Sequence, residues 1–200
     1  MYFKIFIICS ILLVCGVIVV PTQITFADEF EWNSLLSWGD VDKINVVINS
    51  DFDTDVQKVD IVKSVIESKS REENYFYGWN DAISYISEKE VKQIPLFNIV
   101  NNTQEPDVII FLTEKKHHHM MSGFTKYIFS NQTIQKAHVT LYDFDELNEQ
   151  EVEILTRHEL GHVIGLGHTT NPFDLMSPIL SLHYDLISMF DLITLSKIYP

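Results

Sequence analysis

The chain has 200 residues, of which 46% are hydrophobic, and its formal net charge is −14 at pH 7. This length suits one domain plus a targeting segment, and the hydrophobic fraction is ample for a core. Only 14 residues are lysine or arginine, so the sequence has no basic patch of the kind that binds nucleic acid. We therefore expect a globular domain with no nucleic-acid partner.

The N-terminus has the layout of a secretory signal peptide. A lysine precedes an uncharged apolar run at residues 5–20, and small residues stand at the −3 and −1 positions of a cleavage site before Asp28. The run is long enough that an uncleaved membrane anchor is the alternative. We predict a signal peptide or anchor at residues 1–27 and the functional domain at residues 28–200. The domain would be secreted, or anchored facing outside.

Both cysteines of the chain, Cys9 and Cys15, lie inside this apolar run. The remaining domain therefore has no cysteine and forms no disulfide. Its core and any bound metal must hold it together.

The first part of the domain reads as a strand followed by a helical region. Residues 41–49 are rich in β-branched side chains, which predicts the first strand. The acidic run at residues 51–55 is a helix N-cap signal and lacks the spacing of a calcium-binding EF-hand loop. Apolar residues then recur at helical spacing over residues 56–86. A polar stretch at residues 68–74 interrupts this pattern and indicates an insertion or a helix break.

Four further segments predict strands, at residues 97–100, 107–112, 122–128 and 137–142. The second is a continuous apolar run, which is typical of a strand in a covered sheet.

Three adjacent histidines, His117, His118 and His119, could bind a second metal ion. Consecutive side chains of an extended segment point in alternate directions, which suits one ion poorly. We therefore favour a polar loop with incidental metal affinity over a specific second site.

The strongest chemical signal is the sequence HELGHVIGLGH at residues 158–168. His158 and His162 are one helical turn apart and face the same way, so both imidazoles can bind one zinc ion. Gly165 tolerates positive φ, so the chain can turn back and deliver His168 as a third ligand. Three histidine ligands leave a fourth zinc position open, which distinguishes a catalytic site from a closed structural one.

Glu159 lies beside the first histidine but too far round the helix to be a ligand on the same face. Zinc lowers the pKa of a bound water from about 15.7 to near 7. Glu159 would act as general base on this zinc-activated water and pass the proton to the leaving amine. The pattern thus predicts an enzyme that hydrolyses peptide bonds in peptides or proteins, with one catalytic zinc ion.

Two segments downstream make the pattern more specific. Met176, in the sequence DLMSP, follows His168 by about eight residues, and residues 191–199 read DLITLSKIY. With the histidine motif, they resemble the metzincin zinc metallopeptidases, and among these the matrixins, the family of matrix metalloproteinase catalytic domains. In this family the methionine lies in a tight turn beneath the zinc, the Met-turn. Thr169 follows the third histidine, where matrixins usually have serine.

The resemblance implies an α+β fold. Its parts would be a twisted mixed sheet of about five strands, a long first helix at residues 56–86, a zinc-binding helix at about 149–165, the Met-turn and a C-terminal helix. The strand at residues 122–128 would be the edge strand that pairs with an extended substrate. From its position before the last helix, we expect Asp185 to be a cap.

The resemblance also suggests residues of the substrate pocket. Pro178 matches a matrixin position that helps to wall the specificity pocket, and Leu180 stands where matrixins usually have tyrosine. Gly123 and Phe124, from the predicted edge strand, complete the set.

The leading hypothesis is a secreted zinc endopeptidase, which we expect to be a monomer. One alternative is a catalytically silent zinc- or peptide-binding module, but such a protein need not retain a base, and Glu159 is intact. Another is a membrane-surface protein whose apolar N-terminal run is the working part. Membrane association is otherwise expected only if that run is not cleaved.

Overall fold

The computed structural model describes residues 36–199 except residues 91, 102–104, 118–121 and 184. The predicted signal peptide at residues 1–27, together with His118 and His119, lies outside the described residues. Within the described ranges, none of the helices has the length and apolar character needed to cross a membrane.

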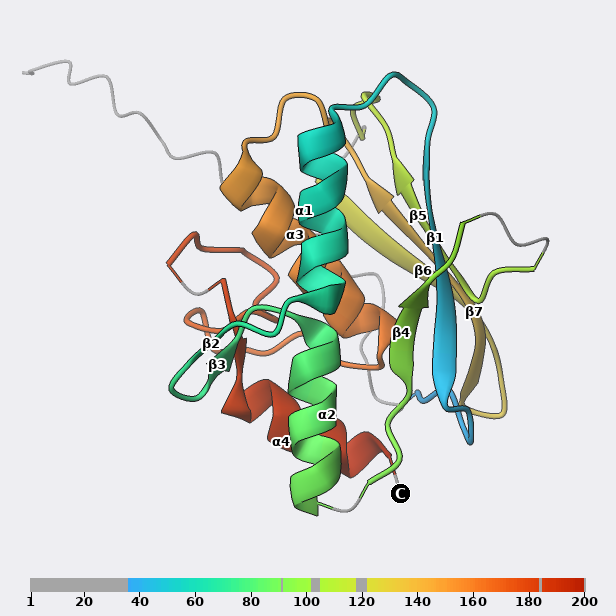
Figure 1. The fold of residues 1–200 in the computed structure, drawn as a ribbon, viewed down its shortest axis with the longest axis vertical. Helices are drawn as coiled ribbons and strands as arrows, with labels where there is room; N and C mark the ends of the chain where they lie inside the picture. Colours follow the sequence, from blue (N-terminus) through green and yellow to red (C-terminus); the bar gives the residue numbers. More distant parts are fainter. Residues whose placement is uncertain (1–35, 91, 102–104, 118–121, 184, 200) are drawn as a thin grey trace, which may run out of the picture.

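A five-stranded mixed sheet forms one layer of the domain (Figure 1). Its strand order is β4-β1-β5-β7-β6. The central pairs are parallel, and β6 pairs antiparallel with β7 at one edge. The strands are β1 (Lys43–Ser50), β4 (Leu96–Ile99), β5 (Val108–Leu112), β6 (Gly123–Ser130) and β7 (Thr133–Leu141). The predicted sheet of about five strands and the edge position of β6 are thus confirmed.

The burial of side chains along β5 shows which face of the sheet packs against the core. Val108, Ile110 and Leu112 are fully buried, whereas Ile109 and Phe111, which point to the other face, are half-buried. One face of the sheet therefore carries the main core, and the helices cover that face (Figure 1).

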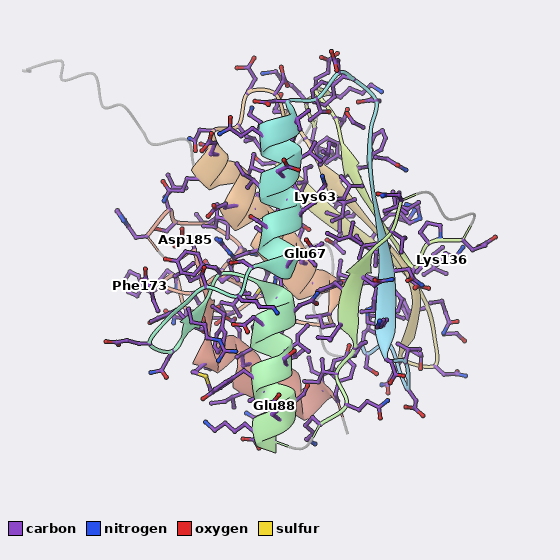
Figure 2. All side chains as sticks on the ribbon, in the orientation of Figure 1. Lys63, Glu67, Glu88, Lys136, Phe173 and Asp185 are labelled. Atoms are coloured by element: carbon purple, nitrogen blue, oxygen red, sulfur yellow. The ribbon has the colours of Figure 1, made fainter. Side chains whose placement is uncertain are left out.

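The described residues form four helices on one side of this sheet (Figure 1): α1 (Val56–Glu67), α2 (Trp79–Glu90), α3 (Glu149–Val163) and α4 (Met189–Ile198). The Asp55 side chain caps α1 by accepting a hydrogen bond from the Gln57 N–H at 2.9 Å, as the acidic run predicts. Helix α1 packs against α3, and α2 packs against α4. Glu67 and Glu88 are exposed on the outward faces of α1 and α2 (Figure 2).

The helical region at residues 56–86 is two helices and not one long helix. A small hairpin, β2 (Arg71–Glu72) and β3 (Tyr75–Phe76), replaces the helix where the polar stretch indicates a break. The Arg71 guanidinium pairs with Asp81 of α2, and its central carbon lies 5.0 Å from the centre of the Phe76 ring. At Gly78 a Cβ would lie 2.3 Å from the Ser68 carbonyl oxygen, so only glycine lets the returning chain pass the end of α1.

The last helix begins differently from the sequence-based expectation. The N-cap of α4 is Ser188, which forms a capping box with Asp191, and so the expectation for Asp185 is wrong. Residues 187–188 form β8 (Ile187–Ser188), which pairs with β3 and holds the chain extended up to Ser188. The Asp185 carbonyl oxygen instead accepts a hydrogen bond of 2.8 Å from Arg157 Nη1.

The second half of helix α3 is buried, and side chains from distant segments donate hydrogen bonds to its backbone carbonyls and to the carbonyl that follows it. The Trp79 indole N–H donates to the Arg157 carbonyl oxygen at 2.9 Å, and the Trp38 indole N–H donates to the Val163 carbonyl oxygen at 2.8 Å. The Tyr199 hydroxyl donates to the Ile164 carbonyl oxygen at 3.0 Å. The bonds from Trp38 and Tyr199 supply partners for carbonyls at and just beyond the end of α3, and they attach the helix to segments near both ends of the described residues.

Candidate active site

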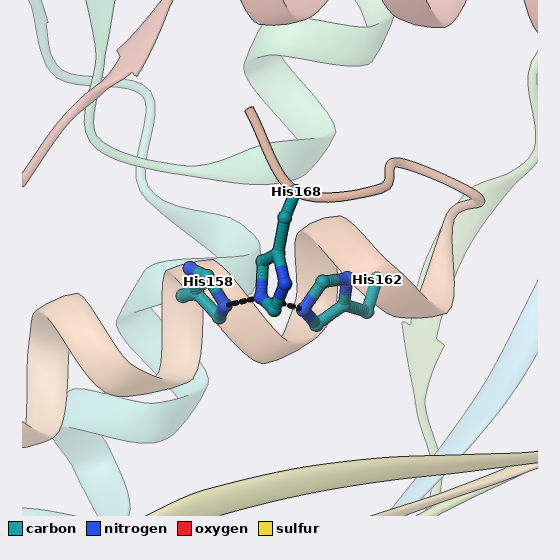
Figure 3. Close-up of side chains that lie close together, drawn as sticks. All are labelled: His158, His162 and His168. Carbon is teal, nitrogen blue, oxygen red and sulfur yellow. Dashed lines mark hydrogen bonds between the residues drawn. The ribbon is translucent and has the colours of Figure 1, made fainter. Parts of the chain in front are cut away.

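The three histidines of the motif converge on one point (Figure 3). His158 and His162 project from the same face of α3, and Gly165, with φ of +106°, turns the chain back so that His168 lies over them. His168 Nε2 lies 3.1 Å from His158 Nε2 and 3.1 Å from His162 Nε2. The predicted role of Gly165 in this return agrees with its conformation.

Two backbone carbonyls orient the first two imidazoles. His158 Nδ1 lies 2.7 Å from the Leu175 carbonyl oxygen, and His162 Nδ1 lies 2.9 Å from the Leu166 carbonyl oxygen. A carbonyl oxygen can only accept, so each Nδ1 carries the hydrogen and each Nε2 presents a lone pair.

Burial keeps these imidazoles neutral. Burial, and then the neighbouring histidines, lower the pKa of His158 well below its usual value. Burial and then His168 lower the pKa of His162 to about 3. The neutral imidazole is the form that binds a metal, so the pocket favours the ligand form of both side chains.

The donor set fits zinc. Tetrahedral ligands at about 2.0–2.1 Å from Zn²⁺ lie about 3.3 Å apart, and the two nitrogen–nitrogen distances of 3.1 Å are close to this value. Among the described residues, His158, His162 and His168 form the one group of at least three histidine, cysteine or acidic side chains whose potential ligand atoms lie close enough together to hold a metal ion. His117 is not part of it, because its ring packs on Tyr142 with ring centres 4.9 Å apart.

Glu159, which follows His158 in α3, is buried, with 1% of its surface exposed. Its Oε2 accepts a hydrogen bond of 2.5 Å from the Thr125 hydroxyl of β6. A Cβ on Gly123 would lie 2.4 Å from Glu159 Oε1, so the absence of a side chain there makes room for the carboxylate. Burial raises the pKa of Glu159 to about 8, although the Thr125 hydrogen bond opposes the shift.

The family comparison can be set against this geometry. The matrixin family model matches residues 67–199. The chain belongs to the matrixin family. A comparison with curated proteins finds no significant match.

Matrixins are zinc metallopeptidases, so the family assigns this chain to the metal-dependent peptide hydrolases and implies that it binds zinc. Strand β1 and nearly all of α1 precede the matched range, yet both pack into the same sheet and core as the rest of this matrixin.

The predicted Met-turn packs against α3. Met176 is buried, and a Cβ on Gly161 would lie 2.4 Å from Met176 Sδ, so the thioether packs against the backbone of α3. The Met176 carbonyl oxygen accepts a hydrogen bond of 2.9 Å from the Thr169 N–H. The departure at Thr169 is therefore harmless to this contact, because only its backbone takes part.

We predict that Met176→Leu lowers stability by about 1 kcal/mol and leaves zinc affinity nearly unchanged. Leucine conserves volume, but its branched Cγ fits the space against Gly161 less well than the unbranched thioether does. Denaturant unfolding and competition with a zinc chelator measure the two quantities. A variant that folds normally and loses zinc would contradict this structural role.

Two buried carboxyl groups, one in the predicted Met-turn and one in the first turn of α4, share a hydrogen bond. Asp174 Oδ1 accepts from the Met176 N–H at 2.9 Å, and Asp191 Oδ2 accepts from the Ser188 N–H at 2.8 Å. The two side chains are also hydrogen-bonded to each other. Burial, followed by the charge of Asp174, raises the pKa of Asp191 to about 7. The pair thus joins the segment around Met176 to the start of α4, and burial raises the pKa of both carboxyl groups.

We predict that the stabilising effect of Asp191 declines as the pH rises from about 4 to about 7. An unfolded Asp titrates near 3.9, so in this window the folded chain binds the proton more tightly, and stability falls until the folded pKa is passed. The difference in unfolding free energy between wild type and Asp191→Asn should shrink by on the order of 3 kcal/mol across it. Asp145→Asn, at an exposed position, is the control. A pH-independent difference would contradict the shift.

The predicted pocket residues have different positions. Gly123 lies against Glu159, whereas Phe124 is 38% exposed and alternates with its neighbours, so its side chain points to the other face of the sheet. After the Met-turn, Pro178 is half-buried and Leu180 is buried. Their roles in substrate binding stay predictions.

Sequence reasoning missed Thr125, which is the hydrogen-bond partner of Glu159. The only signal was a hydroxyl two residues after Gly123 in the predicted edge strand, on the same face.

Proposed function

We propose that this matrixin is a secreted zinc endopeptidase in which Glu159 is the general base. His158, His162 and His168 would hold the ion. The observation that carries the proposal is the convergence of three imidazole nitrogens beside a buried carboxylate. A module that only binds zinc or peptide would need no such carboxylate.

Zinc, when bound, polarises a substrate carbonyl and brings the pKa of a coordinated water near 7. The chain supplies the proton transfer. Glu159 would accept a proton from the attacking water and donate it to the leaving amine. Its Oε1 accepts no hydrogen bond from the described residues, so that oxygen is available for the proton. A bound cation would favour the ionised form of the carboxyl, which opposes the effect of burial.

Strand β6 would align the substrate. Within the described residues it is the terminal strand of the sheet, and its strand partner is β7. Its other edge can offer backbone N–H and C=O groups to an extended peptide. Because Glu159 contacts this same strand through Thr125, a peptide on β6 would lie near the base.

The proposal includes residues 1–27 as a signal peptide, or an anchor if uncleaved, and residues 28–200 as the catalytic domain. Matrixins are typically extracellular, which supports export. The acidic surface and the lack of cysteine after Cys15 are compatible with an exported domain stabilised by its core.

Hydrolysis of a mixed quenched-peptide library tests the activity. The protein is assayed with zinc, after removal of zinc by a chelator, and after zinc is restored. We expect cleavage that disappears with the chelator and returns with zinc. A folded protein that binds one zinc and cleaves none of the peptides would instead support the silent binding module.

A further inference from the structure

The two carboxylate oxygens of Glu159 have unequal surroundings. Oε2 accepts the hydrogen bond from the Thr125 hydroxyl, whereas Oε1 has no hydrogen-bond partner among the described residues. The Thr125 hydroxyl oxygen also lies 3.3 Å from the Glu159 backbone carbonyl oxygen. One hydroxyl on the edge strand therefore contacts both the side chain and the backbone of the same residue of α3.

This contact depends on the alternation of side chains along β6. Gly123 and Thr125 lie on the face that packs against α3, and the intervening Phe124 lies on the other. Gly123 leaves room for Oε1, and the side chain of Leu155 closes the same space from the helix. Thr125, one step along the same face, supplies the donor for Oε2. The strand thus provides a space for one oxygen and a hydrogen bond for the other.

From this arrangement, we infer that Thr125 is a positioning residue that holds Glu159 by Oε2 and leaves Oε1 free to take the proton. The inference rests on the proposed function of Glu159. A β-branched side chain has few χ1 rotamers in a strand, so the hydroxyl is set in direction before substrate binds. A carboxylate fixed at one oxygen also loses less freedom when the reaction begins.

A purely structural role of Thr125 and a positioning role predict different effects on stability and turnover. If Thr125 only satisfied a buried carboxyl, its loss would lower stability and leave turnover intact. If it positions the base, its loss lowers kcat more than it changes KM, because the interaction matters when the proton moves. A serine, which keeps the hydroxyl, should then rescue turnover.

The test compares Thr125→Val, Thr125→Ser and a control, Thr140→Val, in the zinc-loaded full chain. Thr140 pairs with the outward-facing Phe124, so its side chain lies on the opposite face of the sheet from Thr125. We expect Thr125→Val to lower kcat about 10- to 100-fold with KM within about twofold. Thr125→Ser should recover most of kcat, and Thr140→Val should match wild type. Unchanged kcat in Thr125→Val, or no rescue by serine, would overturn the inference.

Crystal structures of the zinc-free wild type and Thr125→Val separate this inference from the proposed function. We expect the Glu159 carboxylate to leave its position beside Gly123 in the variant; an unmoved carboxylate would overturn the inference. If the wild type cleaves no peptide, the proposed function fails and these structures alone decide whether Thr125 holds Glu159. If Thr125→Val does not fold, Thr125→Ala takes its place in both measurements.

Discussion

Glu159→Ala is expected to lower kcat for peptide hydrolysis about 10³-fold while the protein keeps its fold and its zinc. The carboxylate is not one of the three converging donors, so its removal leaves the metal ligands in place. Its side chain is buried between α3 and the edge strand, where the proposed mechanism has it accept a proton from the attacking water. Steady-state kinetics, metal analysis of the purified protein and thermal unfolding measure the three quantities.

The controls for Glu159→Ala separate charge from proton transfer. Glu159→Gln conserves volume and can still accept the Thr125 hydrogen bond, yet an amide is a poor base, so it should be nearly as inactive. Glu149→Ala removes an exposed glutamate from the first turn of the same helix and should keep wild-type kcat. Wild-type kcat in Glu159→Ala would refute the general-base role.

Stability should respond in the opposite sense from activity. Burial raises the pKa of Glu159 because the pocket disfavours its charged form, and Oε1 is unsatisfied among the described residues. Removing the carboxyl therefore relieves a desolvation penalty, and we expect zinc-free Glu159→Ala to be no less stable than the zinc-free wild type.

Local patterns in the sequence predicted that the three histidines converge. The spacing of His158 and His162 depends only on helix geometry, and the turn that returns His168 depends on one glycine. The five strands were likewise predictable from runs of β-branched and apolar residues. These features are set by residues close together in the chain.

Features that depend on distant residues were not predictable in the same way. The polar stretch indicated a break after α1. The β2–β3 hairpin that forms there is held by the salt bridge between Arg71 and Asp81 and by the pairing of β3 with β8. Asp185 was predicted to cap the last helix, but the pairing of β8 with β3 keeps the chain extended and the helix begins after Ser188. The contact of Thr125 with Glu159 joins residues 34 positions apart, which a local pattern does not encode.

Gly165→Ala is expected to lower stability by about 3 kcal/mol or more and to weaken zinc binding. Gly165 has φ of +106°, and a Cβ there would lie 2.3 Å from the Leu36 carbonyl oxygen. The Leu36 carbonyl is a backbone group and cannot rotate away, so either the segment at Leu36 or the turn at Gly165 must shift. Because the turn delivers His168, a shift moves the third ligand away from the other two. Denaturant unfolding and chelator competition measure the two losses.

Gly39→Ala is the matched control for Gly165→Ala because it shares the positive φ without the backbone clash. Gly39 has φ of +67°, and its added Cβ would meet a methyl carbon of Thr133 at 3.2 Å, a side-chain contact that can relax. We expect it to cost only about 1 kcal/mol and to leave zinc affinity unchanged. The excess in Gly165→Ala then measures the contact with Leu36. Equal losses in the two variants would mean that backbone conformation alone matters at Gly165, and that the N-terminal segment at Leu36 does not brace the turn carrying the third histidine.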